Sequence, residues 1–98
     1  MQKLLNLSNH PHQNWPSSQL AAANTKFAQV IDIPFPAVDP QWDSKGIQQA
    51  SLSLAKGIID KYSEKEFAIH LMGEQNMSFI LLQLLITRGY SCLASTSA

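Results

Sequence analysis

The chain has 98 residues, the size of one small domain, and we expect residues 1–98 to share a single hydrophobic core. Charged residues make up only 14% of the chain, against about 25% in typical soluble domains, which favours self-association. Seven Lys and Arg balance seven Asp and Glu, so the formal charge is zero. This balance argues against charge-driven binding of long DNA or RNA, but a small ligand with a few phosphates remains compatible with it.

The cysteine content and the hydropathy pattern bear on the compartment. The single cysteine cannot form an internal disulfide, and no secretory leader precedes the first predicted element. The longest apolar stretch, residues 79–86, contains Gln83 and is far shorter than the roughly 20 residues that cross a bilayer. We therefore expect a cytoplasmic protein without a membrane span.

The first half of the chain predicts a strand, a helix and a second strand. Residues 3–8 form a short Leu-rich run, and a turn-rich stretch follows at 9–14. Strong helix formers predict a helix that begins at Pro16 or Ser17 and ends near Phe27. Residues 28–35 then predict a strand that Pro34 and Pro36 terminate, because proline cannot donate to a ladder.

The second half continues the alternation. Asp43 or Ser44 is the expected cap of a helix with an apolar stripe, which consists of Ile47, Ala50, Leu54, Ile58 and Tyr62. A strand over 67–72, closed by Gly73, precedes a helix over 74–88 that Gly89 ends in the left-handed conformation. A last strand is expected over 90–96. Because helix 74–88 is apolar on nearly every side, it favours a partner helix.

Strands that alternate with helices predict an α/β fold, a Rossmann-like three-layer sandwich with a mainly parallel sheet of about four strands. Ligands of such sheets bind beyond the carboxyl ends of the strands. Short polar groups are expected at that edge and are candidate ligand contacts, namely Ser8, Asn9, His10, Gly73, Glu74, Gln75, Asn76, Ser95, Thr96 and Ser97. Trp15 joins them as a ring that stacks on a base or, alternatively, covers one end of the core.

Two interpretations apply to the start of helix 74–88. Its free amides form a natural phosphate site, although the single Gly73 without a following Lys excludes a Walker-type triphosphate site. Alternatively, Gly73 only permits a tight turn and Glu74 complements the helix dipole.

Histidines and carboxylates supply the candidates for chemistry. His10 and His12 lie in one polar loop, but no further ligand cluster accompanies them, so we expect neither a metal nor another cofactor. His10, nearer the strand end, is the preferred catalytic base or phosphate contact, and Glu74 is the second catalytic candidate. Asp32 either meets a ribose or lies on a solvated edge. Cys92 is interpreted as a core residue.

Four short motifs together resemble small CRISPR-associated Rossmann-like proteins, which are similar to the CARF sensor domains of type III systems. The motifs are Leu-Leu-Asn-Leu-Ser-Asn-His-Pro at 4–11, Ile-Asp-Ile-Pro-Phe-Pro at 31–36, His-Leu-Met-Gly-Glu at 70–74 and Ala-Ser-Thr-Ser at 94–97. The resemblance implies a homodimer, or a higher homo-oligomer, that binds a cyclic oligoadenylate, most often the tetra-adenylate, across its two-fold axis. Helix 74–88 is then the candidate interface.

Members of this group either hold the ring as a sponge or cut it without metal. Cutting members commonly present a Lys or Arg to the phosphate, whereas here Lys3 lies at the opposite end of its strand and Arg88 at the far end of its helix. We therefore expect a sponge that modulates type III CRISPR signalling. The alternatives are a ring nuclease that uses His10 or Glu74, and a structural or protein-interaction subunit. The sequence fixes neither the ring size nor the dimer geometry.

Overall fold

One sheet of four parallel strands, in the order β2-β1-β3-β4, organises the protein. The computed structural model describes residues 2–39 and 41–94. Within them, the strands are β1 (Lys3–Ser8), β2 (Val30–Pro34), β3 (Phe67–Met72) and β4 (Ser91–Ala94). All three strand pairs are parallel, as helical crossovers between successive strands require.

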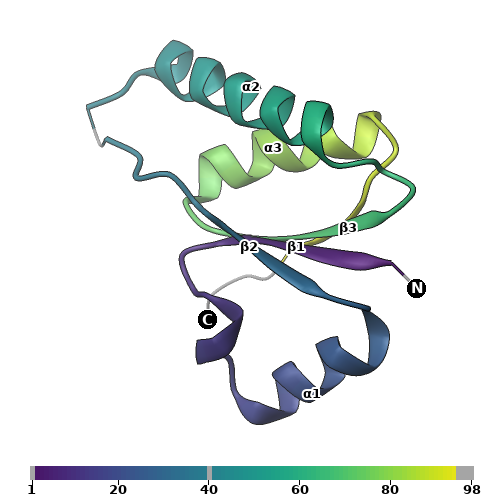
Figure 1. Cartoon of the computed structure of the whole chain (residues 1–98). Coiled ribbons are helices and arrows are strands. Elements are labelled where there is room, and N and C mark those ends of the chain that lie inside the picture. Colours follow the sequence, from purple (N-terminus) through teal and green to yellow (C-terminus); the bar gives the residue numbers. More distant parts are fainter. Residues whose placement is uncertain (1, 40, 95–98) are drawn as a thin grey trace.

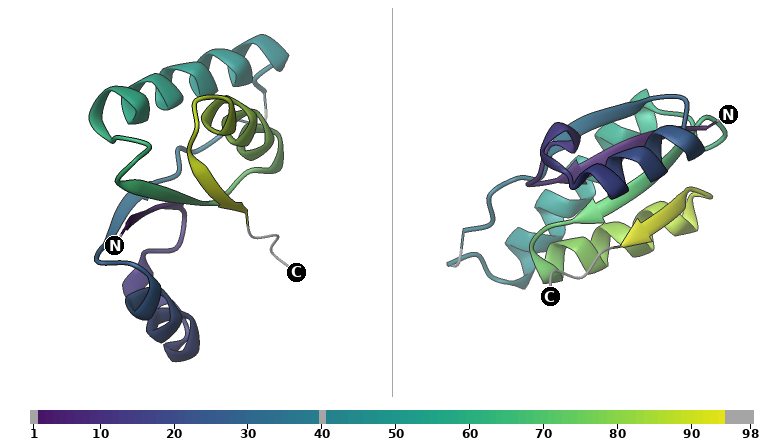
Figure 2. Two further views of the ribbon diagram at one scale, coloured as in Figure 1. Left: turned by 90° about the vertical axis from the view of Figure 1, so that its right-hand side faces the viewer. Right: turned by 90° about the horizontal axis from the view of Figure 1, so that it is seen from below.

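The helices lie on both faces of the sheet (Figures 1 and 2). The helix α1 (Ser17–Lys26) covers one face, whereas α2 (Ser44–Lys61) and α3 (Gln75–Thr87) cover the other. A short 3-10 helix, η1 (His12–Asn14), forms in the stretch that the sequence predicts only as a turn. The predicted Rossmann-like three-layer sandwich is therefore confirmed.

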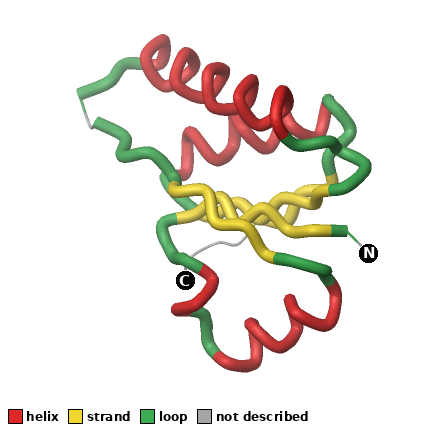
Figure 3. The backbone as a smooth tube through the Cα atoms, in the orientation of Figure 1, coloured by secondary structure: helices red, strands yellow, loops and turns green. Residues whose placement is uncertain are grey.

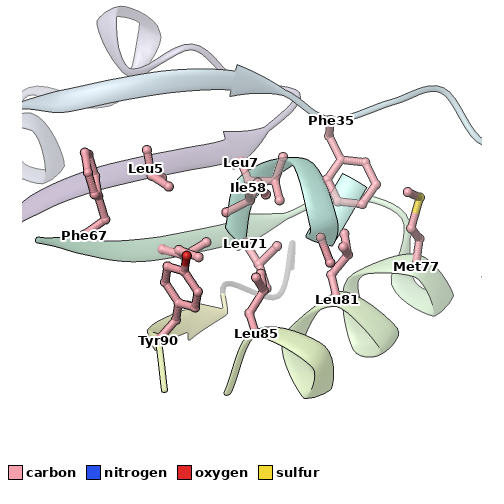
Figure 4. Close-up of a cluster of buried hydrophobic side chains, with 12 residues drawn as sticks. Leu5, Leu7, Phe35, Ile58, Phe67, Leu71, Met77, Leu81, Leu85 and Tyr90 are labelled. Carbon is pink, nitrogen blue, oxygen red and sulfur yellow. The ribbon is translucent and has the colours of Figure 1, made fainter. Parts of the chain in front are cut away.

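The main core lies between the sheet and the pair α2 and α3 (Figure 4). Alternate residues of the central strands point into it, so that Leu5, Leu7 and Ile69 are fully buried. A smaller cluster on the α1 face contains Leu4 and Phe27. The face that α1 covers thus has few apolar contacts, and polar side chains occupy positions on it.

The centre of the buried face of α2 differs from the predicted stripe. Ser51, Ala55 and Ile58 are the buried residues of this helix, whereas Ile47 and Leu54 of the predicted stripe are only partly buried. Ser51 tolerates full burial because its hydroxyl donates to the carbonyl of Ile47, 2.7 Å away. A buried serine inside a helix gives no apolar signal, and the pattern analysis therefore missed it.

Much of the apolar surface of α3 is covered within the chain, by the sheet and by α2. Met77, Leu81 and Leu85 face the core, while Phe79 and Ile86 remain 61% and 53% exposed. The expected partner helix of α3 is thus in part α2 itself. No helix within the described ranges has the length and hydropathy that a membrane crossing needs.

Several predicted boundaries are confirmed and others move slightly. Asp43 caps α2, since its Oδ1 accepts from the Gly46 amide at 2.9 Å. Gly89 has a φ of +98° and ends α3 in the left-handed region, as expected. Pro16 is the N-cap of α1 rather than part of its first turn. The last strand begins one residue later than predicted and is described to Ala94.

Candidate functional site

The strand order reverses between β1 and β3. From β1 the chain passes through α1 to the outer strand β2, and from β2 it passes through α2 on the other face to β3. The segments that follow β1 and β3 therefore leave towards opposite faces (Figure 3). Such a switch point is where open parallel sheets bind ligands. Ser8 at the end of β1 is paired with Met72, the residue before Gly73.

A row of polar side chains crosses the α1 face of the sheet. Asn6 of β1 is in register with Asp32 of β2 and with His70 of β3. Asn6 and His70 are only 1% and 6% exposed. The Asn6 amide nitrogen donates to Asp32 Oδ1 at 2.9 Å, and the Asn6 amide oxygen lies 3.0 Å from His70 Nδ1. Because that oxygen is an acceptor, Nδ1 of His70 carries the proton.

Ser8 extends this row at the carboxyl end of β1. Its hydroxyl lies 3.0 Å from Asn6 Oδ1 and 3.0 Å from the carbonyl oxygen of His10, and it donates to one of them at a time. The His10 amide donates back to the Ser8 hydroxyl at 3.1 Å, and the His10 carbonyl also accepts from Asn6 Nδ2 at 2.8 Å. His10 therefore contributes its backbone to the turn, while its side chain is exposed.

His12, rather than His10, joins the row through its side chain. Its Nδ1 lies 2.9 Å from Asp32 Oδ2, and its backbone amide donates to Asp32 Oδ1 at 3.0 Å. Both side chains are about one-third exposed. Burial raises the pKa of Asp32, but the hydrogen bonds from Asn6 and His12 and the charge of His12 outweigh it, so that the pKa is lowered. Asp32 thus stays ionised beside His12 at neutral pH.

The sequence analysis did not assign His12 to the site. Its contact with Asp32 joins residues 20 positions apart, and it depends on η1 folding back against the edge strand β2. Helical and strand periodicities relate residues only a few positions apart, so they do not predict this contact. The sequence offered one signal for the polar row itself. Asn6 and Ser8 are polar residues two positions apart in a Leu-rich strand, and residues two apart in a strand share a face.

Trp15 borders the polar row and also covers the smaller core. Its ring meets His70 edge to face at 5.5 Å and His12 at 6.3 Å between centroids. It packs against the cluster that contains Leu4 and Phe27. The second of the two interpretations of Trp15, that it covers core residues, is therefore confirmed.

The start of α3 supports the second interpretation of Glu74. Glu74 is the N-cap, and its Oε2 accepts from the Met77 amide at 2.7 Å. The Met77 amide, which a phosphate at this helix end would need as a donor, therefore already donates to Glu74. The negative charge of Glu74 also complements the helix dipole. Gly73 has a separate role, because a Cβ there would lie only 2.5 Å from carbons of the Phe35 ring. A close approach, not a left-handed turn, requires this glycine.

A hollow lies between the beginnings of α2 and α3, at the carboxyl edge of the sheet and on the face opposite α1. Its lining residues are Ser44, Ile47, Gln48, Gln75, Asn76, Phe79 and Ile80. Two predicted ligand contacts, the consecutive residues Gln75 and Asn76, therefore line this hollow. Ser44, Gln48 and Phe79 were not predicted as site residues, since a helix–helix hollow depends on how the two helices pack.

The remaining predictions concern the C-terminus, metals and the cysteine. Ser95, Thr96 and Ser97 lie outside the described residues. Across 2–39 and 41–94, no three His, Cys, Asp or Glu side chains gather as metal ligands would. Burial raises the pKa of the half-buried Cys92 to about 11, so that it is a thiol at neutral pH.

Comparison with known proteins assigns the chain to a family whose description names no activity. No curated protein and no solved structure matches the chain. One family model covers residues 2–98. On that match, the chain belongs to the family described as the uncharacterized protein MJ1673 family.

Proposed function

We propose that this protein binds a cyclic oligoadenylate at the carboxyl edge of its sheet and holds it as a sponge that modulates type III CRISPR signalling. The sequence resemblance suggests the ligand, with the tetra-adenylate as the first ring to test. The observation that carries the proposal is the hollow between α2 and α3 at this edge, where the predicted contacts Gln75 and Asn76 share a lining with Gln48.

The chemistry of the hollow suits adenine. Amide side chains donate and accept at once, as the Watson–Crick and Hoogsteen edges of adenine require, and Gln48, Gln75 and Asn76 supply three of them. Phe79 adds a ring that is 61% exposed, and bases stack on such rings with about 1–3 kcal/mol each. These groups are neutral, so a chain of zero net charge does not oppose this mode of binding.

The proposed complex contains two copies of the chain. A cyclic tetra-adenylate has two-fold symmetry, which an isologous dimer matches. Leu52 of α2 and Ile86 of α3 are each 53% exposed and provide apolar area for such an interface. Light scattering after size-exclusion chromatography should give twice the chain mass, and Ile86→Lys should give the monomer. A wild-type monomer, with and without ring, contradicts the dimer.

Calorimetric titration with cyclic tri-, tetra- and hexa-adenylate tests the binding. We expect a sub-micromolar Kd for one ring and weak binding of linear tetra-adenylate, because a preorganised ring loses less entropy on binding. Gln48→Ala should weaken binding about tenfold, the loss of roughly 1.4 kcal/mol. Gln49→Ala is the matched control, since Gln49 is an exposed neighbour outside the lining of the hollow.

The exposed Leu52 and Ile86 also favour a second candidate function, a structural subunit that binds another protein. The same two experiments separate the candidates. A monomer that binds none of the three rings supports the interaction subunit and rejects the sponge. A dimer that binds one ring, with affinity about tenfold weaker in Gln48→Ala and unchanged in Gln49→Ala, supports the sponge.

A further inference from the structure

The segment from residue 9 to residue 26, here named the strap, follows β1 and contains η1 and α1. Among the described helices, α1 lies on one face of the sheet, while α2 and α3 lie on the other (Figures 1 and 2). Within the strap, which the structure describes in full, Ala23 is the one buried residue, whereas α2 and α3 bury three residues each. Little apolar contact therefore attaches the strap to the sheet.

Polar contacts attach the strap at the carboxyl edge. Asp32 Oδ1 accepts from the His12 amide at 3.0 Å, and Asp32 Oδ2 lies 2.9 Å from His12 Nδ1. The His10 carbonyl accepts from Asn6 Nδ2 at 2.8 Å. When the strap leaves the sheet, water replaces these partners, so each bond contributes only a small net free energy, which is larger at a charged acceptor. Asp32 therefore makes the strongest polar attachment of the strap.

The helix α1 has little stability of its own. Its 10 residues fall short of the roughly 12–15 that an isolated helix needs in water. Its N-cap, Pro16, makes no side-chain hydrogen bond to the first turn, whereas Asp43 and Glu74 cap α2 and α3 with their carboxylates. An α1 that leaves the sheet therefore loses its structure, and the strap detaches and unfolds in one step.

The chain beyond the strap stays attached to β1. The Ala28 amide donates to the Gln2 carbonyl at 2.9 Å, and the Leu4 amide donates to the Gln29 carbonyl at 2.8 Å. These bonds extend the parallel pairing of β1 with β2. The strap thus lies between two segments that remain in the sheet, and its opening leaves the order of the strands intact.

We propose that the strap opens from the sheet as one unit while the rest of the fold persists, and that Asp32 sets the fraction of open molecules. The closed strap covers Asn6, Ser8 and His70, which are 1%, 5% and 6% exposed. Trp15 lies beside His70, with ring centroids 5.5 Å apart. Opening exposes these polar groups at the switch point. The hollow between α2 and α3 lies on the other face, so this inference goes beyond the proposed function and does not rest on it.

Native-state hydrogen exchange of the full-length protein, with peptides read by mass spectrometry, measures the opening. We expect the α1 amides to exchange at least about tenfold faster than the β1 and β3 amides, because opening leaves the main core packed. Dilute urea should accelerate exchange in α1 only slightly, since the opening strap exposes little surface. Exchange in β1 and β3 should rise steeply with urea, because it requires unfolding of the core.

Ile58→Val separates local opening from global unfolding. Ile58 is 3% exposed in the main core, and this core stays packed in both the closed and the open form. The variant should therefore accelerate exchange in β1 and β3 by about 2- to 10-fold and leave exchange in α1 unchanged. Equal acceleration of α1 would show that the strap opens only when the whole protein unfolds, and it overturns the proposal.

Variants of Asp32 test the second part of the proposal. Asp32→Ala removes both contacts to His12 and should accelerate exchange in α1 by about 10- to 100-fold. Asp32→Asn keeps an acceptor for the His12 amide and should accelerate it less. The matched control is Asp39→Ala, since Asp39 also accepts from an amide, that of Gln41, but lies outside the strap. This control should keep the α1 rate within about threefold of the wild type.

Modification of histidines by diethyl pyrocarbonate gives an independent readout, because the reagent reaches only accessible imidazoles. In Asp32→Ala, His70 should react faster by the same factor as α1 exchange, while the exposed His10 side chain should react equally in both proteins. The proposal is overturned if His70 does not follow α1 exchange, or if α1 exchanges as slowly and with the same urea dependence as β1 and β3. An effect of Asp32→Ala no larger than that of Asp39→Ala overturns the role of Asp32.

Discussion

His70 and Asn6 face each other across the two central strands, with Nδ1 of the imidazole 3.0 Å from the amide oxygen. The same amide spans from β3 to β2, because its nitrogen donates to Asp32. One side chain therefore joins three strands through polar contacts on a face that has little apolar packing. The stability of this face should depend on Asn6 more than its size suggests.

Asn6→Ala removes the bridge between the strands. It leaves the buried Nδ1–H of His70 without the Asn6 acceptor and takes a donor from Asp32, so we expect a loss of about 1–3 kcal/mol in the free energy of unfolding. Urea denaturation measures it. Asn24→Ala, at an exposed position of α1, should stay within about 0.5 kcal/mol of the wild type. Equal effects of the two changes would mean that the buried bridge contributes nothing specific.

Gly73→Ala should destabilise the protein because the new methyl group meets the Phe35 ring at 2.5 Å. Overpacking of this kind costs about 1–3 kcal/mol. Gly57→Ala is the control, since nothing lies within 4 Å of a Cβ there, and alanine inside a helix should add about 0.5–1 kcal/mol. In a Phe35→Ala background, the cost of Gly73→Ala should shrink. An undiminished cost there would show that the ring is not the obstacle.

Stability should fall as the pH drops below about 6.5, through His70. Burial lowers the pKa of His70 from the usual 6.5, so the unfolded chain binds this proton more readily than the folded one. The contribution is therefore complete above pH 6.5 and is lost as the pH falls towards the folded pKa. Asp32, whose pKa is lowered from its usual 3.8, adds a similar loss of stability only below about pH 3.8. The pH ranges in which His70 and Asp32 lower the stability are therefore separate.

Urea denaturation at pH 8 and pH 5 measures the effect of His70. The matched variant is His70→Gln, whose amide still donates to Asn6 and does not titrate in this range. We expect a smaller difference between the two pH values in this variant than in the wild type. The assignment to His70 is wrong if both proteins lose the same stability.

Glu74→Ala should cost about 0.5–2 kcal/mol, because the Met77 amide loses its capping carboxylate. Glu74→Gln keeps an acceptor oxygen and should cost less. Neither change is expected to weaken ring binding, since the carboxylate would repel a phosphate at this position. Calorimetry on both variants checks this, and a large loss of affinity in Glu74→Gln would place Glu74 in the ligand site after all.

Cys92 should react slowly with a disulfide reagent in the folded protein. Burial raises its pKa to about 11, and the thiolate is the reactive form. In urea the pKa returns towards 9.0 and the rate should rise steeply. Absorbance of the released thiol at pH 8 follows both reactions. A folded protein that reacts as fast as the unfolded one would show an accessible thiolate.

The order of strands and helices was readable from the sequence, because helical and strand periodicities depend on neighbours only a few residues away. The Leu-rich run at 3–8, the caps at Asp43 and Gly89 and the parallel sheet were all predicted in this way. The edge of the sheet that would carry a site followed from the topology alone. Of the candidate contacts, Gln75 and Asn76 do line a hollow at this edge.

The tertiary structure decided which residues meet. Nothing within residues 9–14 distinguishes His12 from His10. Only the register of β1 with β2 brings Asp32 beside Asn6 and within reach of His12. Likewise, Gly73 is required by an aromatic ring 38 positions earlier in the chain, in Phe35. Contacts of this kind form when distant segments pack, and their energy depends on geometry across elements, which local propensity and periodicity do not encode.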